Sequence, residues 1–120
     1  MMRPANELAD VYLCREPVDF RKGIATLSIL VEAQLELNPF SEHLFVFCNK
    51  KRNAVKILYW EKTGFCLWHK RLEKARFVWP KKMSADAIIM LSGQQLNWLL
   101  DGYNLMQMQG HEVLRYDSVL

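Results

Sequence analysis

The sequence lacks several features that define large classes of proteins. No apolar run approaches the roughly 20 residues that a membrane-spanning helix needs, and the first ten residues contain no apolar signal region. We therefore expect a cytoplasmic protein with no membrane partner. Cysteine is scarce as well, because the chain has only three, at widely spaced positions. We interpret Cys14, Cys48 and Cys66 as small buried side chains in a reducing compartment, rather than as a metal or redox site.

Known catalytic motifs are also missing. The chain contains no Gly-rich phosphate loop, no G-x-S-x-G element and no Cys–His signature. His43, His69 and His111 lie far apart and form no zinc-ligand spacing. A two-metal carboxylate site would need distant acids such as Asp10 and Glu61 to converge, and nothing in their spacing demands it. We therefore predict no enzymatic activity, no catalytic residue, no metal site and no cofactor.

What the chain does contain is a central segment of strand-like runs. Its 120 residues, 51% of them hydrophobic, suit one small domain with a single core. Runs rich in β-branched and aromatic residues, separated by short polar clusters, predict successive antiparallel strands. These runs are Leu44–Cys48, Val55–Trp60, Phe65–Leu72 and Arg76–Trp79.

The second and third of these runs predict a hairpin. Lys62-Thr63-Gly64 fits a three-residue loop with Gly64 in the left-handed conformation, which places Tyr59 opposite Leu67. Alternation then assigns one face to Val55, Ile57, Tyr59, Phe65, Leu67 and His69, and the other to Lys56, Leu58, Trp60, Cys66, Trp68 and Lys70. We expect the first face to pack on the first helix. The second is either a base-stacking surface or, as we favour, covered by a C-terminal helix.

Two helices are expected outside this segment. Asp19 precedes apolar residues at helical spacing, so it is the expected N-cap of a helix that ends near Leu37, before Asn38-Pro39. A capping-box pattern at Ser92 and Gln95 predicts a second helix that stops near Gly102.

The predicted fold is therefore α+β. An antiparallel β-sheet of about four to six strands packs on an N-terminal helix, with a second helix near the C-terminus. We expect residues 1–104 to form this single domain and residues 105–120 to form a C-terminal tail.

Basic charge is concentrated in the central segment. Residues 44–82 contain eleven Lys or Arg and two acids, a net charge of +9, whereas the whole chain carries only +3. The remaining residues therefore carry −6. Basic strands interleaved with Trp suit a nucleic-acid backbone, although an ordinary solvated hairpin has the same composition.

Two basic motifs are candidate phosphate contacts. Arg21 and Lys22 fall in the expected first turn of the helix, where free backbone N–H groups favour anions; the alternative is a solvated turn in which Arg21 pairs with a carboxylate such as Glu16. The hairpin tip around Lys50 can cross a phosphate backbone, or can simply keep the protein soluble. The full candidate set for nucleic-acid binding is Arg21, Lys22, Lys50, Lys51, Arg52, Lys56, Lys70 and Arg71.

Several short motifs occur in a characteristic order. They are "DFRKGI" (Asp19–Ile24), "NPFSEHLFVFCNKKR" (Asn38–Arg52), "KILYW" (Lys56–Trp60), "KRLE" (Lys70–Glu73) and "RFVWP" (Arg76–Pro80). Together they resemble the TnpB-like accessory protein encoded by the second reading frame of the bacterial insertion-sequence-sixty-six family. The resemblance covers about Asp10 to Gly102. It implies a small protein that is encoded beside a separate DDE-type transposase and needed for efficient transposition, without a known catalytic activity.

From charge and resemblance together we predict a transposition accessory protein. It binds DNA, at the element ends or without sequence preference, or the transposase–DNA complex, through the basic hairpin and the first turn of helix one. The alternative is a protein–protein adaptor for the transposase with no direct DNA contact. The sequence leaves open the oligomeric state and the step of transposition that is served.

Overall fold

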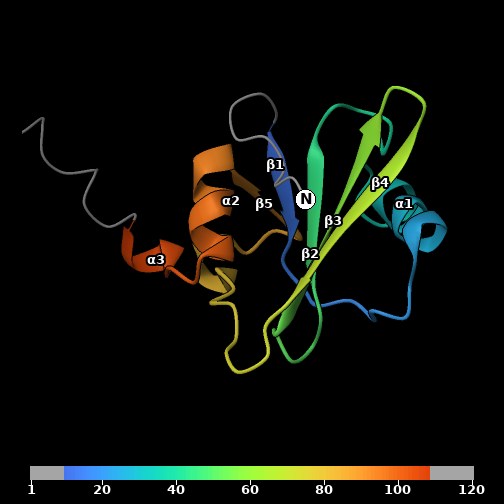
Figure 1. Cartoon of the computed structure of the whole chain (residues 1–120). Coiled ribbons are helices and arrows are strands. Elements are labelled where there is room, and N and C mark those ends of the chain that lie inside the picture. Colours follow the sequence, from blue (N-terminus) through green and yellow to red (C-terminus); the bar gives the residue numbers. More distant parts are fainter. Residues whose placement is uncertain (1–9, 109–120) are drawn as a thin grey trace, which may run out of the picture.

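The computed structural model describes residues 10–108, and a five-stranded sheet lies at its centre (Figure 1). The strands are β1 (Val11–Cys14), β2 (Leu44–Cys48), β3 (Ala54–Glu61), β4 (Gly64–Arg71) and β5 (Ile88–Leu91), in the spatial order β4-β3-β2-β1-β5. The helices are α1 (Ile24–Ala33), the 3-10 turn η1 (Lys81–Met83), α2 (Gly93–Leu100) and α3 (Leu105–Met108). Helix α1 lies on one face of the sheet and α2 on the other. None of the described helices is long and apolar enough to cross a bilayer.

The predicted architecture is wrong in its details. The fold is α+β with a five-stranded sheet, as expected in outline. Its first helix is not N-terminal, however, because β1 precedes α1, which begins only at Ile24. The connection through α1 also brings β1 and β2 together in parallel, with Val11 beside Leu44, so the sheet is mixed rather than antiparallel. A third α-helix, α3, follows α2.

The predicted N-cap of the first helix is also wrong. The carboxylate of Asp19 accepts the backbone N–H of Arg21 at 2.9 Å, and Lys22 N donates to Asp19 O at 3.1 Å, which closes a turn before the helix. Gly23 occupies the N-cap position without a side-chain cap. The helix stops at Ala33, short of the expected Leu37.

The predicted hairpin register is wrong by one residue. Trp60 pairs with Phe65 and Glu61 with Gly64, so Lys62 and Thr63 form a two-residue connection. Lys62, with φ of 46°, takes the left-handed conformation that we expected at Gly64. A one-residue slip changes which face of β3 the side chains of β4 share. Here the side chains of β3 lie on the faces opposite to those expected, so Leu58 and not Ile57 faces α1.

The sheet separates two apolar layers. Beneath α2, Ile57 and Trp68 pack in a cluster that includes Leu96 and Leu99. The expected contact between Ile57 and the first helix is therefore wrong, whereas the expected cover of Trp68 by the C-terminal helix is confirmed. Beneath α1, Leu58 packs in a cluster that includes Phe45, Phe47, Leu27, Leu30 and Val31, with Phe65 and Leu67 at its edge.

The C-terminal part begins as predicted. Ser92 Oγ accepts Gln95 N at 3.1 Å, and Gln95 Oε1 accepts Ser92 N at 2.9 Å, which confirms the capping box. Leu105 of α3 is buried in the cluster beneath α2. The rest of the predicted tail, residues 109–120, lies outside the described residues, and the division of the chain at residue 104 stays a prediction.

Candidate nucleic-acid interface

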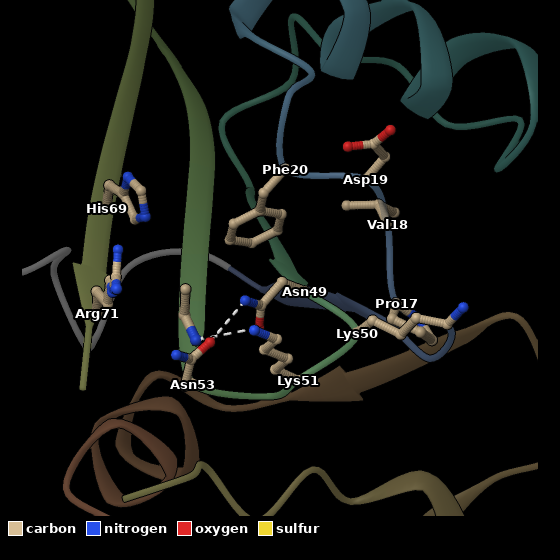
Figure 2. Close-up of a pocket in the computed structure, with 11 residues that line it drawn as sticks. Pro17, Val18, Asp19, Phe20, Asn49, Lys50, Lys51, Asn53, His69 and Arg71 are labelled. Carbon is tan, nitrogen blue, oxygen red and sulfur yellow. Dashed lines mark hydrogen bonds between the residues drawn. The ribbon is translucent and has the colours of Figure 1, made fainter. Parts of the chain in front are cut away.

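A cleft of about 680 Å³ opens where three segments meet: the loop before α1, the β2–β3 turn and the end of β4 (Figure 2). We call it the basic cleft. It is lined by Pro17, Val18, Asp19, Phe20, Asn49, Lys50, Lys51, Asn53, Ala54, His69 and Arg71.

The β2–β3 turn is closed by hydrogen bonds among its own residues. Asn49 Nδ2 donates to Asn53 Oδ1 at 2.7 Å, and Asn49 Oδ1 accepts Ala54 N at 3.1 Å. Arg52 adopts a left-handed φ of 61° and donates its backbone N–H to Asn49 O at 3.0 Å. These contacts present Lys50 and Lys51, both exposed, from an ordered tip.

The opposite wall of the basic cleft is the loop before α1. Val18 N donates to Cys48 O at 2.9 Å, which attaches this loop to the end of β2. Lys56 Nζ donates to Phe20 O at 2.9 Å and to Lys22 O at 3.0 Å, which attaches it to β3. Lys56 is only 7% exposed, so its ammonium donates hydrogen bonds to the loop and is not available to a ligand in solvent.

Arg21 lies beside the basic cleft in an exposed ion pair. Its guanidinium donates to Asp19 at 2.6, 3.0 and 3.1 Å, and this contact, followed by the backbone N–H of Arg21, lowers the pKa of Asp19 to about 2. The alternative considered from the sequence, a solvated turn with a paired Arg, therefore describes the local geometry, although Glu16 pairs with Arg15 and Lys81 instead. An exposed pair of this kind contributes little to stability. Arg21 can therefore exchange Asp19 for another anion.

Two rings lie together inside the basic cleft. The centroids of Phe20 and His69 are 5.8 Å apart, with their planes at 82°. Partial burial, and then the charges of Lys56 and Arg71, lower the pKa of His69. The lowered pKa favours the neutral form of His69, so the formal positive charge of the cleft lining comes from Lys50, Lys51 and Arg71.

The structure brings together only some of the eight predicted residues. Lys50, Lys51 and Arg71 line the basic cleft, and Arg21 and Lys22 directly follow two of its lining residues. The other three lie elsewhere. Arg52 lines a separate hollow of about 350 Å³ with Lys81 and Lys82, Lys70 Nζ donates to Leu100 O at 3.3 Å at the end of α2, and Lys56 is buried.

Sequence reasoning included Phe20 and Asn53 in the two basic motifs without predicting that they line a site, and it missed His69. The asparagines that flank the basic tip, Asn49 and Asn53, were an available signal, because Asn side chains often close turns. His69 was assigned to a core face by its alternation with Phe65 and Leu67, which do pack on the α1 side. At the end of β4, however, His69 pairs with Lys56 and is exposed.

The described residues offer no evident metal centre. Within residues 10–108, no three His, Cys, Asp or Glu side chains form a group that could hold a metal ion. Cys14 and Cys48 are buried, and burial raises the pKa of Cys48 to about 12, whereas Cys66 is only partly buried. The prediction of small buried thiols is therefore confirmed for two of the three cysteines.

Comparison with known proteins identifies relatives along the whole chain. The family model described as IS66 Orf2 like protein matches residues 9–110. Uncharacterized protein y4hO of Sinorhizobium fredii is 35% identical over 101 residues, covering 84% of this chain and 86% of that protein. Uncharacterized protein y4jC of the same organism is 29% identical over 119 residues, covering 99% of each. No solved structure matches the chain. The chain therefore belongs to the family of IS66 Orf2-like proteins.

Proposed function

We propose that this protein assists transposition of its insertion sequence by binding DNA, alone or together with the DDE-type transposase, through the basic cleft. Membership of the IS66 Orf2-like family implies the accessory role in transposition. In this proposal the protein works in the cytoplasm and contributes by binding rather than by catalysis.

One observation carries the DNA contact. Lys50, Lys51 and Arg71 converge on a single cleft, and among residues 10–108 none of the three forms an ion pair. Unpaired cations that line one concave surface favour an anionic ligand, because each bound phosphate releases condensed counterions. Arg21 can add a further contact at the margin by exchanging its Asp19 partner.

Phosphate contacts of this kind position a protein but carry little sequence information. Binding should therefore be largely independent of sequence and should weaken steeply as salt rises. A salt titration of DNA binding, followed by fluorescence anisotropy, measures this dependence directly.

The decisive variant replaces the three cleft cations, as Lys50→Gln, Lys51→Gln and Arg71→Gln together. We expect the log–log salt slope to fall by up to about 0.9 for each lost contact. The matched control removes three exposed cations outside the cleft, as Lys62→Gln, Lys74→Gln and Arg76→Gln, and should retain most of the slope. Equal slopes for the two triple variants, or no DNA retained at about 50 mM salt, would contradict the proposal.

The alternative function, a protein–protein adaptor for the transposase, has its own supporting observation. Phe40, Trp60 and Phe65 form a cluster with ring centroids 5.0 to 5.2 Å apart, and Phe40 is 54% exposed. This aromatic cluster lies beside the β3–β4 turn, where Trp60 pairs with Phe65, whereas Ala54 of the basic cleft lies at the opposite end of β3. An exposed aromatic group is typical of the centre of a protein interface.

A pull-down with the transposase in the absence of DNA tests the adaptor. We expect Phe40→Ser to weaken transposase capture if this function holds, and Tyr103→Ser, at a residue 56% exposed elsewhere, to leave it unchanged. Capture that requires added DNA, and is insensitive to Phe40→Ser, would reject the adaptor.

A further inference from the structure

Two aromatic rings, those of Phe20 and His69, line the basic cleft together with its cations. Phosphate binding alone does not require such rings. The rings of Phe20 and His69 meet at 82°, so they form an aromatic corner in which a flat group stacked on one ring presents its edge to the other. Pro17 and Val18 add apolar surface elsewhere in the lining of the basic cleft. Phe20 is held in place because the ammonium of Lys56 lies 4.9 Å from its ring centroid, whereas His69 is exposed and accessible.

Other lining residues of the basic cleft supply hydrogen-bond donors and charge. The side-chain nitrogen of Asn53 donates no hydrogen bond among the described residues, although its oxygen accepts from Asn49 at 2.7 Å. An amide nitrogen of this kind can donate to an acceptor on the edge of a base. Lys51 and Arg71 line the same cleft, where they can meet the adjoining phosphate (Figure 2).

We infer that the basic cleft receives an unpaired nucleotide, with its base in the aromatic corner of Phe20 and His69 and its phosphate at Lys51 and Arg71. This inference rests on the proposed function and names its ligand class, single-stranded DNA in preference to duplex. The volume of about 680 Å³ suits a ligand of nucleotide size.

Duplex DNA cannot use the aromatic corner. In a duplex the faces of the bases are stacked on one another, and only their edges and the phosphates are accessible. A single strand can turn a base out and stack it on an aromatic side chain, and such stacking is tolerant of sequence. The ring pair therefore adds affinity for the single strand, while the cations bind both forms.

The test compares the two forms directly. Fluorescence anisotropy of the full chain is measured with a labelled strand of about 12 nucleotides, and with the same strand annealed to its complement, at about 50 mM salt. We expect the single strand to bind about tenfold more tightly than the duplex.

Two variants assign this difference to the aromatic corner. His69→Ala should weaken single-strand binding about tenfold and leave duplex binding within about twofold. Phe20→Leu keeps apolar bulk in the loop but removes the ring, and should act in the same direction. Tyr103→Ala is the control, because it removes an exposed aromatic side chain outside the cleft. Circular dichroism shows whether each variant is folded.

The outcomes separate this inference from the proposed function. Equal binding of single strand and duplex, or equal loss of both on His69→Ala, would overturn the inference and leave DNA binding by the cleft in place. If neither form binds, the proposed function fails as well. A single-strand preference that survives both His69→Ala and Phe20→Leu in folded variants would assign the preference to another surface and also overturn the inference.

Discussion

The ammonium of Lys56 and the backbone carbonyl of Phe20 lie 2.9 Å apart, although 36 positions separate the two residues in the chain. A buried ammonium is costly unless it is hydrogen-bonded, and here the carbonyls of Phe20 and Lys22 supply the partners. The contact fixes the loop that forms one wall of the basic cleft. Lys56 therefore shapes the candidate interface from beneath, and its charge is not presented to a ligand.

Replacing this lysine should be costly. Lys56→Met leaves the carbonyls of Phe20 and Lys22 without their donor, so we expect the free energy of unfolding to fall by about 1.5–3 kcal/mol in a urea titration. The control is Lys74→Met at an exposed position, with an expected change within about 0.5 kcal/mol. Equal stabilities of the two variants would show that the buried hydrogen bonds contribute little.

The core beneath α2 can be tested at Ile57. Ile57 is fully buried, so Ile57→Ala should lower the free energy of unfolding by about 2–5 kcal/mol through lost burial and a residual cavity. Ile29 on α1 is 61% exposed, and Ile29→Ala should change stability by less than about 0.5 kcal/mol. A small effect at Ile57, measured by denaturant unfolding, would contradict the packing of β3 against α2.

The pairing of Asp19 with Arg21 predicts a pH dependence. The pKa of Asp19 is about 2, below the ordinary value of 3.8, so the folded state holds this proton less tightly than the unfolded chain does. The resulting stabilisation is complete above pH 3.8 and is lost as pH falls through about 2.

An NMR titration of the Asp19 carboxyl group measures this value. Arg21→Ala should raise the pKa toward 3.8, because the side chain of Arg21 is the largest cause of the shift. Lys22→Ala is the comparison, and should move the pKa less. A carboxyl group that titrates near 3.8 in the unaltered protein would reject the ion pair.

The capping box of α2 predicts a stability change at an exposed residue. Ser92→Ala removes the acceptor of Gln95 N, and should lower the free energy of unfolding by about 1 kcal/mol. Ser28 is the matched control within α1, where its hydroxyl donates to Ala25 O at 2.8 Å. Ser28→Ala should be neutral or slightly stabilising in the same thermal or urea unfolding experiment, because such a bond competes with the helix.

Two predicted helix caps, at Ser92 and at Asp19, show where a local sequence pattern is sufficient and where tertiary contacts are needed. Ser92 and Gln95 form the predicted cap because both partners lie within one turn of chain. Asp19 had two local options, a helix N-cap or a turn closed by its own carboxylate, and both satisfy the same backbone N–H groups. The structure has the turn, and in it the carbonyls of Phe20 and Lys22 accept hydrogen bonds from Lys56.

The register of the β3–β4 hairpin also depends on tertiary contacts and not on the local pattern alone. Loops of two and three residues both fit Lys62, Thr63 and Gly64 locally, but they place Trp68 on the same face as Ile57 and on the same face as Leu58, respectively. The observed register places Ile57 beside Trp68 in the cluster beneath α2, and no pattern within the hairpin contains that information.

By itself the sequence determined the concentration of basic charge in residues 44–82, the positions of three of the four predicted central strands, the capping box and the family resemblance. The fourth predicted strand, Arg76–Trp79, is wrong, because these residues form no strand. Only the tertiary structure decided which cations face a ligand. Lys51 and Lys56 are the same residue type five positions apart, yet one is exposed at the basic cleft and the other is buried. The reason is physical: a lysine can be buried only where hydrogen-bond acceptors replace its water, and those of Lys56 come from the loop at Phe20 and Lys22, distant in the chain.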